Sequence, residues 1–131
     1  MKINPCLGIP VRFDAKYTGI SDSRGLWRWK KIFVGPAFLA FPPREQQALL
    51  LHEVGHCKLK HLEKRLRSLW LLFWRPRALA VLCRAQELEA DRFAAACGYG
   101  AELAEAFRRM KHVDSPLHPH ISERIARLTI A

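Results

Sequence analysis

The sequence lacks the features that define several classes of protein. It has no apolar run of roughly 18 to 20 residues, so we expect no membrane-spanning helix. Its four cysteines form no CxxC pair, which argues against a disulfide framework, and Cys57 and Cys97 are expected to act as small buried apolar side chains. The N-terminus has no long apolar stretch of the secretory type. We therefore expect a reducing, cytoplasmic location.

The composition is that of a single folded domain. Hydrophobic residues make up 50% of the 131 residues and charged residues 26%, unlike a disordered chain. This length is enough to bury a core but too short for two domains, so we treat residues 1–131 as one domain with one site. The net charge of +10 indicates an anionic partner such as nucleic acid or a lipid surface. Many of the cations surround the most apolar segment: Lys58, Lys60, Lys64, Arg65, Arg67, Arg75, Arg77 and Arg84.

Strands are expected in the first third of the chain. Val11 to Ala15 and Leu26 to Val34 are rich in aromatic and β-branched residues, and the turn-forming residues 21–25 separate them. This pattern predicts a β-hairpin or small sheet. Trp27 and Trp29 alternate with basic residues, so a strand would place both indoles on one packed face.

Helices are expected in the remainder. Pro42-Pro43 should begin a helix that runs into the sixties, since proline is tolerated in the first turn. A second helix, roughly Ala78 to Cys97, should end at Gly98, a residue suited to a left-handed cap. Two shorter helices are predicted for 101–111 and 122–128. Strands followed by helices give an α+β fold.

The first predicted helix carries the sequence His52-Glu53-Val54-Gly55-His56, an HExxH motif. Four residues are just over one helical turn, so both imidazoles project from one face and can bind one metal ion, while Glu53 holds a water beside it. The surrounding residues are apolar, and buried histidines without partners are costly. The alternative interpretation is a pair of structural histidines with satisfied hydrogen bonds.

A catalytic zinc ion needs a third protein ligand and an open position for water. The metzincin pattern would require glycine at 59 and histidine at 62, but the residues are Leu59 and Leu62. On a continuous helix, His61 points away from His56, and we predict a partly exposed side chain for it.

Glu87 is the preferred third ligand. It lies four residues before Asp91, so both share one face of the second long helix, and Asp91 can orient a ligand histidine by a hydrogen bond. Glu89 is about 200° from Glu87 and cannot share that face. Ala90 and the alanines at 94–96 allow this helix to approach the HExxH helix closely.

Three blocks of sequence carry a family resemblance. They are residues 32–56, which end in HExxH; residues 87–100, which begin Glu-Leu-Glu-Ala-Asp; and residues 118–128, which begin His-Pro-His-Ile-Ser-Glu-Arg. In this order they resemble the HtpX-like and CAAX-prenyl-endopeptidase-like gluzincin metallopeptidases, especially the soluble minimal members called minigluzincins.

The resemblance implies a zincin-like fold and a zinc-dependent endopeptidase that cleaves extended or unfolded polypeptides, either active or latent. It maps the metal ligands onto His52, His56 and Glu87, the general base onto Glu53, and the supporting aspartate onto Asp91. It also implies that the substrate pairs with a sheet edge, for which our candidate is the strand Lys31 to Val34.

The oxyanion of the tetrahedral intermediate needs a hydrogen-bond donor besides the metal. His118 is our candidate, because Pro119 restricts it to extended geometry that can aim its imidazole into the cleft, and a structural hydrogen bond is the alternative role for it. Arg124 competes for this role, although we favour for it a salt bridge that fixes the last helix. His112 and His120 are expected on the surface.

Two other functions remain open. An ImmA/IrrE-type metallopeptidase, whose family cleaves repressor proteins, shares HExxH and Glu-x-x-Ala-Asp, but the block that begins at His118 argues against it. A basic module that binds nucleic acid through a structural metal would need four ligands, whereas the candidates leave one position open. Nucleic acid is therefore not the favoured partner.

The segment Leu66 to Cys83 is the most apolar part of the chain. Residues 70–74 read Trp-Leu-Leu-Phe-Trp, and arginines flank them. Many members of the resembling family have transmembrane helices here, but Arg75-Pro76-Arg77 interrupts this one. We expect it to be buried in the core, to form an oligomer contact, or to bind the anionic inner face of a membrane.

Overall fold

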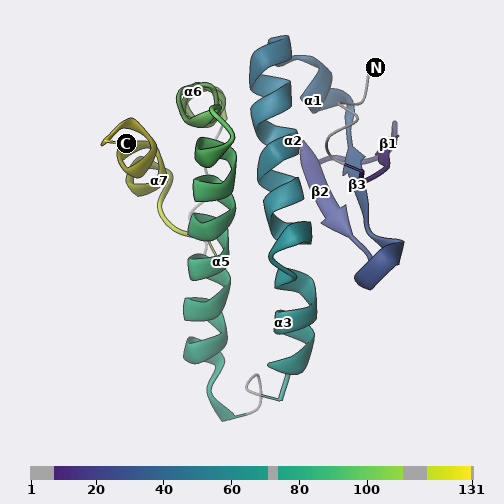
Figure 1. The fold of residues 1–131 in the computed structure, drawn as a ribbon, viewed down its shortest axis with the longest axis vertical. Coiled ribbons are helices and arrows are strands. Elements are labelled where there is room, and N and C mark those ends of the chain that lie inside the picture. The colour runs from purple at the N-terminus through teal and green to yellow at the C-terminus, as the bar shows by residue number, and fades with distance from the viewer. Residues whose placement is uncertain (1–7, 71–73, 111–117, 131) are drawn as a thin grey trace.

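The computed structural model describes residues 8–70, 74–110 and 118–130, and it shows a small α+β protein that is mostly helical (Figure 1). The predicted order of strands followed by helices is confirmed. The first part contains β1 (Val11–Phe13), β2 (Ser21–Arg24), the short 3-10 helix η1 (Trp27–Trp29) and β3 (Lys31–Val34). The helices are α1 (Pro36–Leu39), α2 (Pro43–Lys58), α3 (His61–Arg67), α5 (Pro76–Ala96), α6 (Gly100–Arg109) and α7 (Ile121–Ile130).

The three strands form one sheet in the order β1-β3-β2. β1 runs parallel to β3, and β2 runs antiparallel to it, with Ser21 opposite Val34. The sequence prediction was wrong in two respects. The residues expected to form a turn, 21–24, are an edge strand, and Lys31–Val34 is the central strand rather than an edge. Pairing with β3 overrides the weak β-propensity of Ser21-Asp22-Ser23-Arg24.

The two tryptophans of η1 do not lie on a packed sheet face. Trp27 is 69% exposed and Trp29 is 67% exposed. Gly25 at φ +93° and Trp27 at φ +50° turn the chain after β2, which ends the strand. The backbone N–H of Trp27 donates to Glu63 Oε1 on α3 at 2.8 Å, which ties η1 to that helix.

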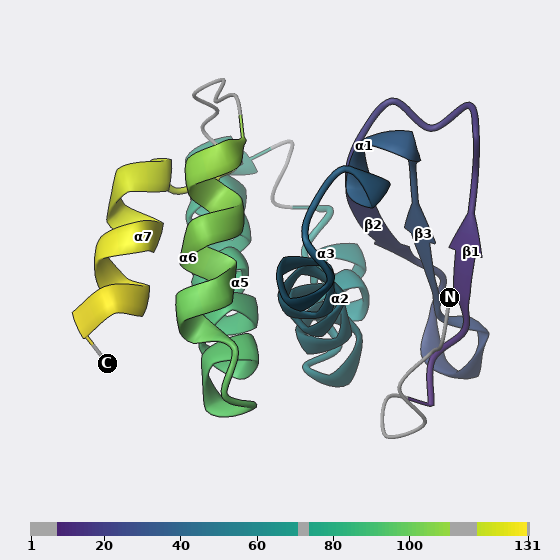
Figure 2. The same cartoon turned by 90° about the horizontal axis from the view of Figure 1, so that it is seen from above.

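Helix α2 lies between two layers of the structure. Seen from above, the sheet is on one side of α2 and α3, and α5 and α6 are on the other, with α7 outermost (Figure 2). Residues 48–57 are consequently buried without a break. A helix covered on both sides is apolar around most of its circumference. The core around it includes Ile32, Val34, Phe38, Leu103 and Phe107.

Helix α5 ends where the sequence predicts. Gly98 has a φ of +89°, and the N–H of Tyr99 donates to the carbonyl of Ala94 at 3.1 Å, which closes the last turn. Cys97, just before this glycine, is exposed, so its expected burial is wrong. Cys57 is buried as expected.

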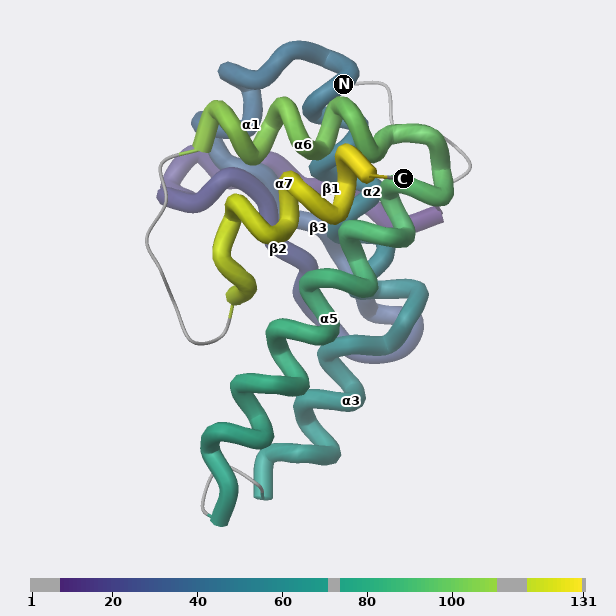
Figure 3. Tube along the Cα trace, turned by 90° about the vertical axis from the view of Figure 1, so that its left-hand side faces the viewer, coloured from purple at the N-terminus to yellow at the C-terminus, as the bar shows by residue number. Residues whose placement is uncertain are grey.

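The apolar segment after α3 is only partly in the core. α3 and the first half of α5 lie side by side and extend beyond the rest of the molecule (Figure 3). Near this tip Trp70 is 62% exposed and Trp74 is 78% exposed, so burial in the core is wrong for these two side chains. Residues 71–73 lie outside the described part. None of the described helices is long and apolar enough to cross a bilayer.

The contact between α2 and α5 depends on Gly55. A Cβ atom at this position would lie 3.0 Å from Cβ of Phe93 and 3.1 Å from Cα of Ala90, both on α5. These distances are shorter than ordinary carbon contacts, and Cα of Ala90 belongs to the backbone. Glycine at 55 and alanine at 90 therefore set how closely the two helices approach.

We predict that Gly55→Ala destabilises the protein by about 1 to 3 kcal/mol, the usual effect of an overpacked core. Alanine is more favourable than glycine in an isolated helix by roughly 1 kcal/mol, so helix propensity alone predicts that this substitution stabilises the protein, whereas packing predicts that it destabilises it. Chemical denaturation measures the free energy of unfolding. An increase in that free energy would contradict the close approach of α2 and α5 at this residue.

Candidate metal centre

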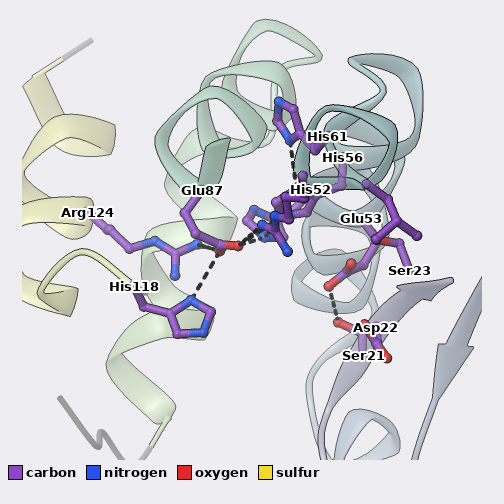
Figure 4. A pocket seen from close by; sticks show the side chains of 12 residues that line it. Ser21, Asp22, Ser23, His52, Glu53, His56, His61, Glu87, His118 and Arg124 are labelled. Atoms are coloured by element: carbon purple, nitrogen blue, oxygen red, sulfur yellow. Dashed lines mark hydrogen bonds and ion pairs between the residues drawn. The ribbon is translucent and has the colours of Figure 1, made fainter. Parts of the chain in front are cut away.

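Three side chains converge between α2 and α5. Nε2 of His52 lies 3.1 Å from Nε2 of His56. Glu87 faces both rings, with Oε2 at 3.4 Å from Nε2 of His52 and Oε1 at 3.2 Å from Nε2 of His56. Figure 4 shows the three side chains meeting between the helices. All three are buried.

These separations fit a single tetrahedral metal ion. Nitrogen and oxygen ligands bind zinc at roughly 2.0 to 2.2 Å, so two of them on a tetrahedral ion lie about 3.3 to 3.6 Å apart. The three observed distances, 3.1, 3.4 and 3.2 Å, are within a few tenths of an ångström of that range. Among the described residues, His52, His56 and Glu87 are the one group of this kind that can hold a metal ion.

A carboxylate orients His52 from behind. Its Nδ1 lies 2.9 Å from Oδ1 of Asp91, on the side of the ring away from Glu87. Asp91 is held in turn by Arg124 of α7, whose Nε and Nη2 donate to the two carboxylate oxygens at 2.8 and 2.7 Å. This bidentate pair is buried. It fixes the orientation of Asp91, and it anchors α7 to α5.

Hydrogen bonds and burial set the charges of the cluster. Burial lowers the pKa of His52, but hydrogen bonds to Asp91 and Glu87 outweigh this effect and raise it to about 10. Burial lowers the pKa of His56. Burial also opposes the charge on Glu87, yet the imidazoles of His118, His52 and His56 around it hold its pKa well below its usual range. A metal cation would therefore replace a proton on His52.

Glu53 lies beside the cluster and faces the sheet. Its Oε1 accepts a hydrogen bond from Oγ of Ser21 on β2 at 3.1 Å, and the side chain is buried (Figure 4). Burial raises the pKa of Glu53, and the charge of Glu87 raises it further, whereas His52 and the Ser21 hydrogen bond lower it. Glu53 is thus a carboxylate next to the three converging side chains but not one of them.

The structure corrects the prediction for His61. α2 ends at Lys58, and Lys60 has a left-handed backbone with φ +56°, so the chain turns before α3 begins. His61 is consequently only 1% exposed, and its Nδ1 lies 2.8 Å from Nδ1 of His56. Its Nε2 lies 3.2 Å from Oε2 of Glu89. The prediction assumed a continuous helix, and Leu59-Lys60-His61 contains no glycine or proline to indicate a break.

Three basic side chains surround Glu87. His118 lies at the rim with a 55% exposed side chain, and its Nδ1 is 3.8 Å from Oε2 of Glu87. Arg124 Nη2 lies 3.4 Å from the same oxygen. Nη2 of Arg65 on α3 lies 3.6 Å from Oε1 of Glu87. The sequence analysis did not predict that Arg65 belongs to this site. His120 is exposed as expected and contacts Ser122, whereas His112 lies outside the described residues.

The cluster opens into a cleft of about 260 Å³. One wall is β2, which contributes Ser21, Asp22 and Ser23, and the opposite side includes His118 and Arg124. The converging side chains are therefore reachable from the surface. A group bound by His52, His56 and Glu87 would keep an accessible side.

Comparison of the chain with models of protein families, with curated proteins and with solved structures gives no match. The function proposed below rests on the residues and geometry of this site.

We predict that the purified protein binds one zinc ion and that Glu87→Ala abolishes most of this binding, because one of three ligands is removed. Asp91→Asn should weaken zinc binding about 10- to 100-fold, since the bond that orients His52 is weakened. Competition with a chromophoric chelator measures both affinities. Glu123→Gln, an exposed carboxylate on α7, is the control. Full zinc occupancy in Glu87→Ala would place the third ligand elsewhere.

Proposed function

We propose that this protein is a zinc-dependent metalloendopeptidase of the gluzincin type, with a zincin-like arrangement of sheet and helices. The observation that carries the proposal is the convergence of His52, His56 and Glu87 at tetrahedral spacing on the wall of an open cleft. Glu53, a buried carboxylate outside this ligand set, lies beside them. Three ligands plus a separate carboxylate are what metal-assisted hydrolysis requires.

The donor set supports zinc as the metal. Two imidazole nitrogens and one carboxylate are among its preferred ligands, and His₂Glu is a known catalytic zinc set. When bound, zinc supplies a Lewis acid that polarises a carbonyl and makes water more acidic. The chain orients His52 through the contact of its Nδ1 with Asp91.

Glu53 would act as the general base. It takes a proton from the attacking water and later gives it to the amine that leaves. The hydrogen bond from Ser21 holds one carboxylate oxygen toward β2, which leaves the other oxygen available for proton transfer. The cleft beside Glu53 gives a water and a substrate carbonyl access to it.

The substrate would bind along β2. In the described sheet β2 pairs with β3 on one side only, and Ser21, Asp22 and Ser23 line the cleft. An extended peptide can add to such an edge as a further strand, with its backbone next to Glu53. The sequence-based candidate, Lys31–Val34, is the central strand and has no free edge in this sheet. This mode of binding suits extended or unfolded polypeptide segments.

His118 and Arg124 would have different roles. Arg124 is buried, and its Nε and Nη2 donate to Asp91, so we assign it to positioning Asp91 and α7. His118 sits at the mouth of the cleft and is free of such a bidentate pair. It is therefore the better candidate to donate a hydrogen bond to the developing oxyanion.

The site favours catalysis over a structural metal. A closed structural zinc site has four protein ligands, whereas three converge among the described residues, and they face a cleft. An ImmA/IrrE-type enzyme would share this ligand set. The block that begins at His118 is what favours the gluzincin alternative, because it supplies both His118 and Arg124 to the site.

We also propose that the tip formed by α3 and α5 contacts an anionic membrane surface on the cytoplasmic side. Between Lys64 and Arg84 the sequence has six basic residues and no acidic one. Trp70 and Trp74 are exposed among them, and tryptophan prefers the interface between lipid and water. Basic residues near such a surface each contribute about 1 kcal/mol. An oligomer contact is the alternative for the same surface.

We predict that Glu53→Gln retains zinc but loses at least about 100-fold in kcat, because an amide cannot accept the proton of water. The assay is the cleavage of a fluorescently labelled unfolded polypeptide, with zinc content measured on the same samples. Glu105→Gln, an exposed carboxylate on α6, is the control. Unchanged turnover in zinc-loaded Glu53→Gln would contradict the mechanism, and zinc without hydrolysis in the wild type would indicate a latent enzyme.

We predict that the protein sediments with phosphatidylserine vesicles but not with neutral ones, and that high salt releases it. The double variant Arg75→Gln and Arg77→Gln should bind roughly 30-fold more weakly, which corresponds to about 2 kcal/mol. Trp70→Ser with Trp74→Ser should also weaken binding. Trp27→Ser with Trp29→Ser removes two other indoles that are also more than half exposed, and this double variant is the matched control. Concentration-dependent association without vesicle binding would favour the oligomer contact.

A further inference from the structure

His61 is a buried titratable side chain to which the proposed reaction gives no task. It is 1% exposed, and it lies between His56 on α2 and Glu89 on α5. His56 directs Nε2 toward His52 and Glu87, so its Nδ1 faces away from them and toward His61. The three side chains form a continuous chain of polar contacts that starts at a candidate metal ligand.

The backbone around His61 is fixed as well. The left-handed conformation of Lys60 places His61 at the start of α3, below the end of α2. The carbonyl of His61 accepts a hydrogen bond from Nε2 of Gln86 at 3.2 Å, and Gln86 is itself buried. Oε1 of Gln86 accepts a hydrogen bond from Nε of Arg65 at 2.5 Å. Both the ring and the main chain of His61 are thus held against α5.

The contact between two ring nitrogens determines where the protons lie. A pair of nitrogens 2.8 Å apart needs one proton between them, so one ring donates and the other accepts. A histidine that binds a metal through Nε2 carries its proton on Nδ1. His56 must then donate to Nδ1 of His61, which leaves the proton of neutral His61 on Nε2, where it can be donated to Glu89. With His56 protonated on Nδ1 and His61 protonated on Nε2, every hydrogen bond from His56 to Glu89 has one donor and one acceptor.

We propose that His61 and Glu89 form a hydrogen-bond relay that fixes the tautomer and ring orientation of His56 and so presents Nε2 to the metal. This inference rests on the proposed metal site, and it makes His61 a positioning residue. The two ligand histidines would be supported differently. Asp91 contacts His52 directly, whereas Glu89 supports His56 through an intervening imidazole.

The relay differs from a purely structural role in what a substitution should do. Leucine and asparagine at position 61 are both branched at Cγ and have the same number of side-chain heavy atoms, although asparagine is the smaller. The oxygen of asparagine can take the place of Nδ1 and accept the proton of His56, whereas leucine leaves this buried donor without a partner. If His61 only fills space, the two variants should bind zinc equally well.

The test is the zinc affinity of the wild type, His61→Leu and His61→Asn, measured by competition with a chromophoric chelator. We expect His61→Leu to bind zinc about 10- to 100-fold more weakly, as is typical when a ligand histidine loses its partner. His61→Asn should lose less than about tenfold. Glu89→Met should reduce zinc affinity less than His61→Leu does, because Glu89 is partly exposed and water can replace its carboxylate. Leu66→Asn, an asparagine introduced at an exposed residue of α3, is the control.

A second measurement separates positioning from folding. The nitrogen chemical shifts of His56 in the zinc-loaded protein report which ring nitrogen carries the proton, and chemical denaturation gives the stability of each variant. We expect a single Nδ1–H tautomer in the wild type and in His61→Asn. Wild-type zinc affinity in His61→Leu, or equal losses of affinity and stability in the leucine and asparagine variants, would overturn the relay alone. A wild type that binds no zinc would overturn the proposed function as well.

Discussion

The close contact of α2 with α5 is the constraint on which the site depends. α2 provides His52, Glu53 and His56, and α5 provides Glu87 and Asp91, so the spacing of the ligands is the spacing of the two helices. Gly55 lies within the HExxH motif itself, between Glu53 and His56. Because glycine has no side chain, Ala90 and Phe93 can pack directly against the backbone of α2 at this position. The motif thus contains both the donors and the residue that lets their partner helix approach.

Buried charge links the site to every layer of the fold. Asp91 is neutralised by Arg124 from α7, Glu45 of α2 by Arg109 from α6, and Glu63 of α3 by Lys30, which follows η1. A buried carboxylate without a partner would cost several kcal/mol, so each pair requires its two elements to pack together. The helices and the loop around the cleft are therefore positioned by polar contacts in addition to apolar packing.

The sequence predicted those features that depend on local periodicity. The faces shared by His52 and His56, and by Glu87 and Asp91, follow from helical geometry, and the left-handed Gly98 ended α5 where expected. Features set by tertiary contacts were missed. β2 has few β-forming residues and exists because β3 pairs with it. His61 entered the site because Lys60 adopts a left-handed conformation that its residue type does not favour, and Arg65 followed with α3.

The surface position of the tryptophans has a spectroscopic consequence. All four, Trp27, Trp29, Trp70 and Trp74, are more than half exposed, and none belongs to the core. Their emission in the folded protein should already resemble that of indoles in water, so it reports little about unfolding. The same emission should shift to shorter wavelength when an indole leaves water. Intrinsic fluorescence is therefore a poor probe of unfolding for this protein. It is a sensitive probe of any partner or membrane that covers the exposed tryptophans.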